Sequence, residues 1–327
     1  MDYLYLNPIF EAHSNHRYNT ADYLNVDPLL GTNEEFEVLC REAAKYGIGI
    51  VLDGVFSHTG SDSRYFNREA AMGWRRLPRP NSPYRSWYDF DPKYKGGYRS
   101  WWGFETLPEV NEENPSYVEF ITGEGGVIDT WLRRGAAGFR LDVADELPDD
   151  FIEKIRAAVK RVSPEKFLLG EVWEDATTKY GFGQRRTYLL GKGLDSVMNY
   201  PFKNAVLDFV KGKPAEQAMG EILSICEHYP APAMDTALNF LSTHDTERAL
   251  TVIADEPANG RGREWQSGRC VVGEAYEEGM LRLRMAYAII YTLPGVPCLY
   301  YGDEIGMQGY RDPSTVPSSA GTATKSA

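Results

Sequence analysis

The sequence predicts an α/β fold with a parallel sheet, a (β/α)8 TIM barrel, on three observations. Short apolar segments that end in polar residues alternate with stretches at helical spacing, as in βαβ units. The composition is that of a globular protein, with 43% hydrophobic and 25% charged residues among 327. Barrels of this type commonly run to about 250 residues or more as one domain, so the length suits a single barrel.

Seven buried strands are expected, rich in Val, Ile, Leu and Phe. They span residues 3–7, 48–53, 138–142, 167–171, 196–200, 238–243 and 297–301. A closed barrel of this type needs eight strands. Because the chain opens directly on an apolar run, we expect its first barrel strand to be missing and residues 3–7 to form the second.

Helices are expected between these strands. One follows the first strand, with Asn33 as its N-cap and Gly47 as its left-handed stop. Its apolar side is expected to carry Phe36, Leu39, Ala43 and Tyr46. Further helices are expected at 149–162, 214–228 and 277–293, and residues 123–126 interrupt the helix expected before Trp131.

The interval between the second and third of these strands is too long for one βα unit. Asp53 and Asp142 are 89 positions apart, and residues 59–112 are rich in Pro, Tyr and Trp. We therefore expect 59–112 to form an inserted small domain after the third barrel strand, with 1–58 and 113–312 as the barrel. Residues 313–327 are mostly Ser, Thr, Ala and Gly, which predicts a disordered tail.

Charge and cysteine patterns exclude several classes of partner. The chain has 35 Lys and Arg against 47 Asp and Glu, a net charge of −12, so a nucleic-acid partner is not expected. The four cysteines lack C-x-x-C spacing, which indicates buried thiols in a reducing compartment. No apolar run approaches ~18 residues and no export signal is visible, so we expect a cytoplasmic protein without a membrane partner.

Ionisable residues follow the ends of several predicted strands, which is where barrel active sites lie. Asp53 ends one strand, and Arg140 and Asp142 share one face of the next because they are two apart. Glu171 ends the following strand, and Asp245 follows a later one. The Arg140 guanidinium is expected to lower the pKa of Asp142.

Two of these carboxylates suit glycoside hydrolysis with retention. That reaction needs an ionised nucleophile and a protonated acid about 5–5.5 Å apart. Asp142 suits the first role, and Glu171, which lies among apolar residues, suits the second. Asp245 could stabilise the positive charge that develops on the sugar, whereas Asp53 is expected to orient Arg140 rather than to react.

Four segments resemble, in order, signature stretches of the α-amylase family, glycoside hydrolase family 13. They are DGVFSH (53–58), GFRLDVADE (138–146), GEVW (170–173) and FLSTHD (240–245). Two further stretches, LYLNPIF (4–10) and GVPCLYYGDE (295–304), are similar to the second and eighth strands of the family. The stretches LPEVN (107–111) and HRYNTADY (16–23) resemble the neopullulanase, maltogenic amylase and cyclodextrinase group.

The resemblance implies roles for individual residues. Asp142 would be the nucleophile, Glu171 the acid/base and Asp245 the stabiliser of the transition state. The residues implied to bind the substrate are Tyr18, His58, Arg140, His244, Trp173 and Glu174. No organic cofactor is implied. Some relatives bind calcium near the first strand, but its ligands are not identifiable in this sequence.

The sequence therefore predicts a retaining hydrolase for α-1,4 bonds of maltooligosaccharides, cyclodextrins, pullulan or starch, with α-1,6 bonds as an open second linkage. Two alternatives stay open: an α-glucan transglycosylase with the same site, and a truncated, inactive fragment that binds α-glucans. Oligomerisation also stays open. Four aromatic residues of the inserted segment, Trp87, Tyr88, Trp101 and Trp102, could form either a sugar-stacking platform or the core of the small domain.

Overall fold

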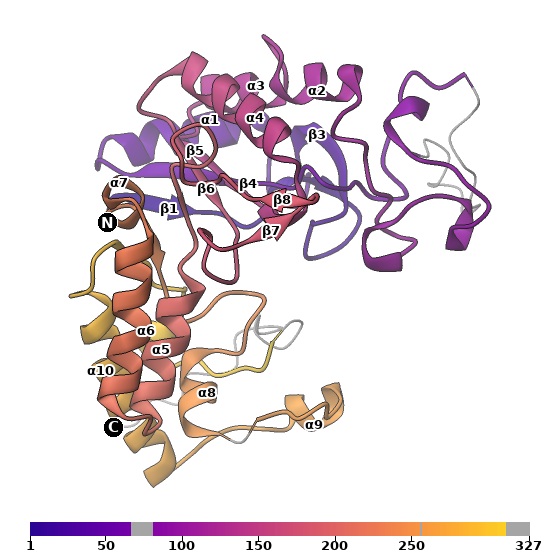
Figure 1. The fold of residues 1–327 in the computed structure, drawn as a ribbon. Coiled ribbons are helices and arrows are strands. Elements are labelled where there is room, and N and C mark those ends of the chain that lie inside the picture. The colour runs from indigo at the N-terminus through magenta and orange to yellow at the C-terminus, as the bar shows by residue number, and fades with distance from the viewer. Residues whose placement is uncertain (67–80, 256, 312–327) are drawn as a thin grey trace. The chain divides into compact units, whose positions relative to one another are not determined.

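The computed structural model describes residues 1–66, 81–255 and 257–311, so the predicted tail at 313–327 lies outside the described residues. The chain divides into two compact units (Figure 1). The first unit comprises Met1–Val172 and Ala176–Ser196, and the second comprises Trp173–Asp175 and the chain from Val197 onward. The predicted inserted domain at 59–112 falls within the first unit, and its independence as a domain stays a prediction.

A parallel sheet forms the centre of the first unit. Its strands β1 (Tyr3–Tyr5), β4 (Gly49–Gly54), β5 (Gly138–Leu141) and β6 (Phe167–Gly170) are neighbours in that order. The sheet order ends with β9 (Ser196–Val197), within which the chain passes into the second unit. The register places Asp53 opposite Arg140, so their side chains leave neighbouring strands at the same level.

Four helices belong to this unit: α1 (Asn33–Ala44), α2 (Pro115–Thr122), α3 (Val127–Arg133) and α4 (Asp149–Val162). Helix α4 has the predicted bounds. It packs against α2 and α3, beside which Figure 1 also draws it. Residues 123–126 separate α2 from α3, which confirms the predicted interruption.

Two predictions for α1 were wrong. Its N-cap is Thr32 rather than Asn33, because Thr32 and Glu35 form a reciprocal capping box. The Thr32 side chain accepts a hydrogen bond from the Glu35 N–H, and the Glu35 carboxylate accepts one from the Thr32 N–H. The buried residues are Phe36 and Cys40, whereas the predicted Leu39 and Tyr46 are exposed. Gly47 has the expected left-handed backbone, with φ of 71°.

Two antiparallel pairs were not predicted. They are β2 (Phe10–Ala12) with β3 (Thr20–Val26), and β7 (Tyr180–Gly181) with β8 (Gln184–Arg185). The inserted segment contains the short 3-10 turns η2 (Arg85–Trp87), η3 (Lys95–Gly97) and η4 (Trp101–Gly103), and η5 (Ala144–Glu146) follows β5. Trp87 of this segment packs on Tyr117 and Phe120 of α2, with ring centroids 5.1 and 5.2 Å apart.

The second unit is mainly helical. It contains α5 (Tyr200–Val210), α6 (Ala215–His228), α7 (Ala231–Met234), β10 (Leu238–Asn239), α8 (Ala249–Ala254), α9 (Arg263–Ser267), α10 (Glu274–Ile290), β11 (Val296–Pro297) and η6 (Asp303–Ile305). Strands β10 and β11 are parallel. Helix α10 begins three residues earlier than predicted. Helix α5 was not predicted, because the strand expected at 196–200 ends at Val197 and the Asn199 side chain caps a helix instead.

All seven predicted strands are present in the described part of the chain. Strand β4 has the predicted length and lies one residue later than predicted, and the other six are shorter than predicted. The strand pairs whose direction is defined within the first unit's sheet are parallel, and so is β10 with β11. Consequently the polar residues at the strand ends of the first unit emerge at one edge of its sheet.

Candidate active site

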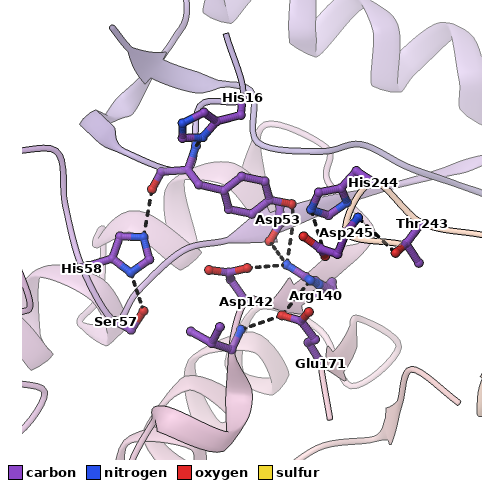
Figure 2. A network of polar contacts seen from close by, with 12 residues as sticks. His16, Asp53, Ser57, His58, Arg140, Asp142, Glu171, Thr243, His244 and Asp245 are labelled. Atoms are coloured by element: carbon purple, nitrogen blue, oxygen red, sulfur yellow. Dashed lines mark hydrogen bonds and ion pairs between the residues drawn. The ribbon is translucent and has the colours of Figure 1, made fainter. Parts of the chain in front are cut away.

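Arg140 is the centre of the polar cluster at this edge (Figure 2). Its side chain is fully buried, and Nη1 donates to Asp53 Oδ1 at 2.8 Å, to Asp53 Oδ2 at 3.0 Å and to Asp142 Oδ1 at 2.9 Å. Its Nη2 forms an ion pair with Glu171 Oε2 at 2.8 Å, outside hydrogen-bond geometry. The structure thus places three carboxyl groups around one guanidinium. Asp53 lies in β4, Asp142 directly follows β5, and Glu171 directly follows β6.

Three carboxyl groups share one cation in this cluster. All three carboxylates are buried, and one cation faces them. Burial by itself would lower the pKa of Arg140, but the nearby Asp53 and Glu171 carboxylates outweigh burial and raise that pKa well above its usual value. Arg140 therefore stays charged and can compensate negative charge on the carboxyl groups that contact it. The sequence-based pKa expectations for Asp142 and Glu171 stay predictions.

The shared arginine limits the separation of Asp142 and Glu171. Each carboxylate contacts a different terminal nitrogen of the same planar group, at 2.9 and 2.8 Å. Since those nitrogens are only about 2.3 Å apart, the contacting oxygens lie at most about 8 Å apart. Retaining glycosidases have carboxyl groups about 5–5.5 Å apart and inverting ones about 6.5–9.5 Å apart. This upper limit admits both classes.

Val143 links the two carboxylates through the backbone. Its N–H donates to Glu171 Oε2 at 2.8 Å, and it directly follows Asp142. Val143 has a left-handed backbone, with φ of 40° and ψ of 51°, which is strained for a β-branched residue. Sequence reasoning missed this contact, because nothing in the residue type indicates the conformation.

Two tyrosines complete the hydrogen bonding of Asp53. The hydroxyls of Tyr5 and Tyr18 donate to Asp53 Oδ2 at 2.6 and 2.9 Å. Burial, reinforced by the Asp53 charge, raises the pKa of both hydroxyls well above the usual value, so both stay protonated and can donate. Tyr18 was predicted at the site. Tyr5 was missed because the first strand was expected to continue to residue 7, whereas β1 ends at Tyr5.

His58 is buried beside these groups. Its Nδ1 lies 2.9 Å from Ser57 Oγ and its Nε2 lies 3.1 Å from the Tyr18 carbonyl oxygen. Burial lowers the pKa of His58 to about 4. We infer a neutral ring at pH 7 in which Nε2–H donates to Tyr18 and Nδ1 accepts from Ser57. The predicted contact of His58 with substrate stays a prediction.

Four predicted site residues belong to the second unit. There His244 Nε2 lies 3.1 Å from Asp245 Oδ2, and the Asp245 N–H donates to Thr243 Oγ1 at 3.2 Å. Trp173 stacks on Tyr200 with centroids 4.3 Å apart, and Glu174 is exposed. The predicted meeting of Asp245 with the carboxylates of the first unit stays a prediction.

Within residues 1–66, 81–255 and 257–311, no group of three or more His, Cys, Asp or Glu side chains is arranged to hold a metal ion. Among the helices of this described part, none has both the length and the apolar character needed to cross a membrane.

The sequence matches one known family along nearly its whole length. Residues 1–326 match the family described as alpha amylase, catalytic domain. The chain belongs to the alpha-amylase family. The predicted (β/α)8 barrel fold class, shared by solved members of the family, is thereby confirmed.

Individual relatives in the alpha-amylase family are similar along nearly the whole chain. The chain is 37% identical over 349 residues to an amylopullulanase of Thermoanaerobacter thermohydrosulfuricus and 34% identical over 319 residues to neopullulanase 2 of Thermoactinomyces vulgaris. Each match covers 95% of this chain, but 22% and 47% of the respective relative. The chain therefore spans about half or less of the length of these proteins.

A solved member of the alpha-amylase family shows the same similarity in structure. It is the cyclic alpha-maltosyl-(1→6)-maltose hydrolase of Arthrobacter globiformis, with a TM-score of 0.79 and 30% identity. The match covers 96% of this chain and 64% of the hydrolase. The same hydrolase has also been solved in complex with maltose. The predicted likeness to the neopullulanase, maltogenic amylase and cyclodextrinase group is confirmed by relatives with these names.

Proposed function

We propose that this protein is a retaining glycoside hydrolase that cleaves α-1,4 glucosidic bonds of maltooligosaccharides and related α-glucans. The observation that carries the proposal is the pair Asp142 and Glu171, both buried and both in contact with Arg140. Relatives named amylopullulanase, neopullulanase and cyclomaltodextrinase support the substrate class. Pullulan, starch and cyclodextrins are the polymers and rings to test, with α-1,6 bonds as a second linkage.

In the first step, Asp142 attacks the anomeric carbon while Glu171 donates its proton to the departing glycosidic oxygen. The bond from sugar to leaving group breaks, and an ester bond forms between the sugar and Asp142. In the second step, Glu171 removes a proton from water, and the resulting oxygen nucleophile displaces Asp142 from the anomeric carbon. The sugar leaves with its original anomeric configuration, and both carboxyl groups return to their starting protonation states.

The surrounding residues prepare these two groups. Arg140 favours the ionised form that Asp142 needs as a nucleophile, because it donates directly to Oδ1. Asp53 holds Arg140 through two hydrogen bonds and acts as a positioning residue. Tyr18 and His58 are proposed to contact the sugar at the cleavage point. Asp245 and His244, together with Trp173 and Glu174, are proposed from the family resemblance as further substrate contacts, with Asp245 stabilising the oxocarbenium-like charge.

The proposal is tested by amide replacement of the proposed acid/base. Glu171→Gln is expected to lower kcat on maltooligosaccharides by about 10²–10⁴-fold, because proton transfer to the leaving oxygen is lost. Reducing-sugar release from starch, pullulan and a cyclodextrin would be measured for the parent and the variant. Glu165→Gln is a matched control, since Glu165 is exposed and lies just before the opposite end of β6. Hydrolysis by Glu171→Gln at the parent rate would contradict the proposal.

A further inference from the structure

The four aromatic residues named in the inserted segment differ in how far their side chains are exposed. Trp87 and Tyr88 are 2% and 5% exposed, so they belong to the core of the first unit. Trp102 is 78% exposed, and the neighbouring Phe104 is 56% exposed. Trp101 lies between these extremes. We call Trp101, Trp102 and Phe104 the aromatic platform.

A single carboxylate orients both indoles of the aromatic platform. Trp101 Nε1 donates to Glu146 Oε2 at 2.5 Å, and Trp102 Nε1 donates to Glu146 Oε1 at 2.7 Å. The ring centroids of Trp101 lie 5.8 Å from those of Trp102 and 6.2 Å from those of Phe104. The polar edge of each indole is thus occupied, whereas the flat apolar face of Trp102 is left to solvent.

The backbone at Trp102 is also unfavourable. Its φ of 50° and ψ of 24° are left-handed values that residues other than glycine rarely adopt. Gly103, the next residue, has φ of 78° and lets the turn close. A strained backbone that displays a large apolar ring to water contributes nothing to the core, and such features cluster at ligand sites.

Contacts connect the aromatic platform to the carboxylate cluster within the first unit. The Trp101 ring lies 5.3 Å from the His58 ring, and His58 Nε2 lies 3.1 Å from the Tyr18 carbonyl oxygen. Tyr18 in turn donates to Asp53. Glu146, which holds both indoles, follows the proposed nucleophile Asp142 by four residues. An oligosaccharide bound at Asp142 and Glu171 could therefore extend onto the aromatic platform.

We propose that Trp102 and Phe104 form an accessory subsite that stacks against a glucose unit of an α-glucan, away from the unit that is cleaved. A pyranose ring presents C–H groups on its faces and hydroxyls around its rim, so an aromatic face can cover the apolar part while water keeps the hydroxyls. The inference rests on the proposed function for its substrate class. It adds that long oligosaccharides bind more tightly than short ones because of Trp102.

Calorimetric titration of maltoheptaose and maltotriose into proteins carrying Asp142→Asn tests this subsite without turnover. Adding Trp102→Ala is expected to weaken maltoheptaose binding about 5–10-fold and maltotriose binding much less. Trp102→Phe keeps a flat ring and is expected to retain most of the affinity. Tyr46→Ala is the matched control, because Tyr46 is an aromatic residue that is 80% exposed after α1, and it should change neither affinity.

The outcomes separate the two proposals. Equal maltoheptaose affinity with and without Trp102→Ala would overturn the subsite, as would an equal loss in Tyr46→Ala. Thermal unfolding of each variant checks that a loss does not come from misfolding, and Trp102→Phe and Phe104→Ala supply independent measurements if Trp102→Ala is unstable. The proposed function fails separately if the parent protein releases no reducing sugar from any α-glucan, a result that leaves the titrations unaffected.

Discussion

At the scale of single residues, one buried arginine organises the candidate site. Three carboxylates lie around the Arg140 guanidinium, and two tyrosine hydroxyls bind the same Asp53 that Arg140 holds. A buried charge that loses its partner is costly, so removing the arginine should affect stability as well as catalysis.

Arg140→Met is expected to reduce the free energy of unfolding of the first unit by about 3–5 kcal/mol, because buried carboxylates lose their compensating charge. Urea unfolding followed by circular dichroism would measure the change. Arg185→Met removes an exposed arginine from the same unit and should cost far less. Equal stability of the two variants would show that Arg140 does not compensate the buried charges.

His58 makes a specific contribution to the pH dependence of stability. Its pKa is about 4 in the folded protein, against about 6.5 in the unfolded chain, so the unfolded chain binds more protons between these values. Stability from neutral His58 is fully present above about pH 6.5 and is lost as the pH falls toward 4. Between pH 7 and pH 5 the loss is expected to be about 2 kcal/mol.

Comparing the parent with His58→Gln isolates this contribution, since all other groups titrate in both proteins. From pH 7 to pH 5, the free energy of unfolding should fall by about 2 kcal/mol more in the parent than in His58→Gln. Parallel pH profiles would mean that His58 titrates normally in the folded protein.

At the scale of elements, the capping box fixes where α1 begins. Thr32→Ala is expected to lower the free energy of unfolding by about 1 kcal/mol, because the Glu35 N–H loses its acceptor. Thr32→Ser keeps the hydroxyl and should retain most of the stability. Chemical denaturation of the two variants would decide. If both lost the same stability, the hydroxyl would not be what caps the helix.

Helical periodicity predicted helix α4 more accurately than helix α1. Helix α4 was predicted with its observed bounds, since Phe151, Ile155 and Val159 repeat every four residues and a proline follows. In α1 the same kind of spacing predicted that Leu39 would face inward with Phe36, which is wrong for Leu39. The structure buries Cys40, which packs so closely on Gly135 that a Cβ there would lie 2.6 Å from the Cys40 Cβ. Gly135 is distant in sequence from α1, so the local pattern of α1 could not show its contact with Cys40.

The candidate site also has some features that the sequence could predict and others that it could not. Arg140 and Asp142 could be placed together because alternation along one strand is a local property. The contacts of Tyr5 with Asp53 and of Val143 with Glu171 depend on strand register and on one left-handed residue. Both contacts are set by tertiary structure. The sequence therefore indicated Asp53 as a partner of Arg140, but it did not indicate the contacts of Tyr5 and Val143.

At the scale of the whole molecule, the chain contains two compact units and belongs to the alpha-amylase family. The amylopullulanase and the neopullulanase that it matches are longer than this chain. The proposed nucleophile and acid/base both lie in the first unit, beyond the neighbouring strands β5 and β6. The central claim, a covalent intermediate on Asp142 formed and released with the help of Glu171, therefore depends on the geometry of that unit.

Trapping the intermediate tests this claim most directly. In Glu171→Gln, α-maltosyl fluoride should still react, because fluoride leaves without a proton, whereas release by water needs the missing base. Mass spectrometry of the digested protein is expected to find one maltosyl group on the peptide that contains Asp142. A sugar attached to another residue, or turnover without any labelled peptide and with the β-anomer as the first product, would contradict the account.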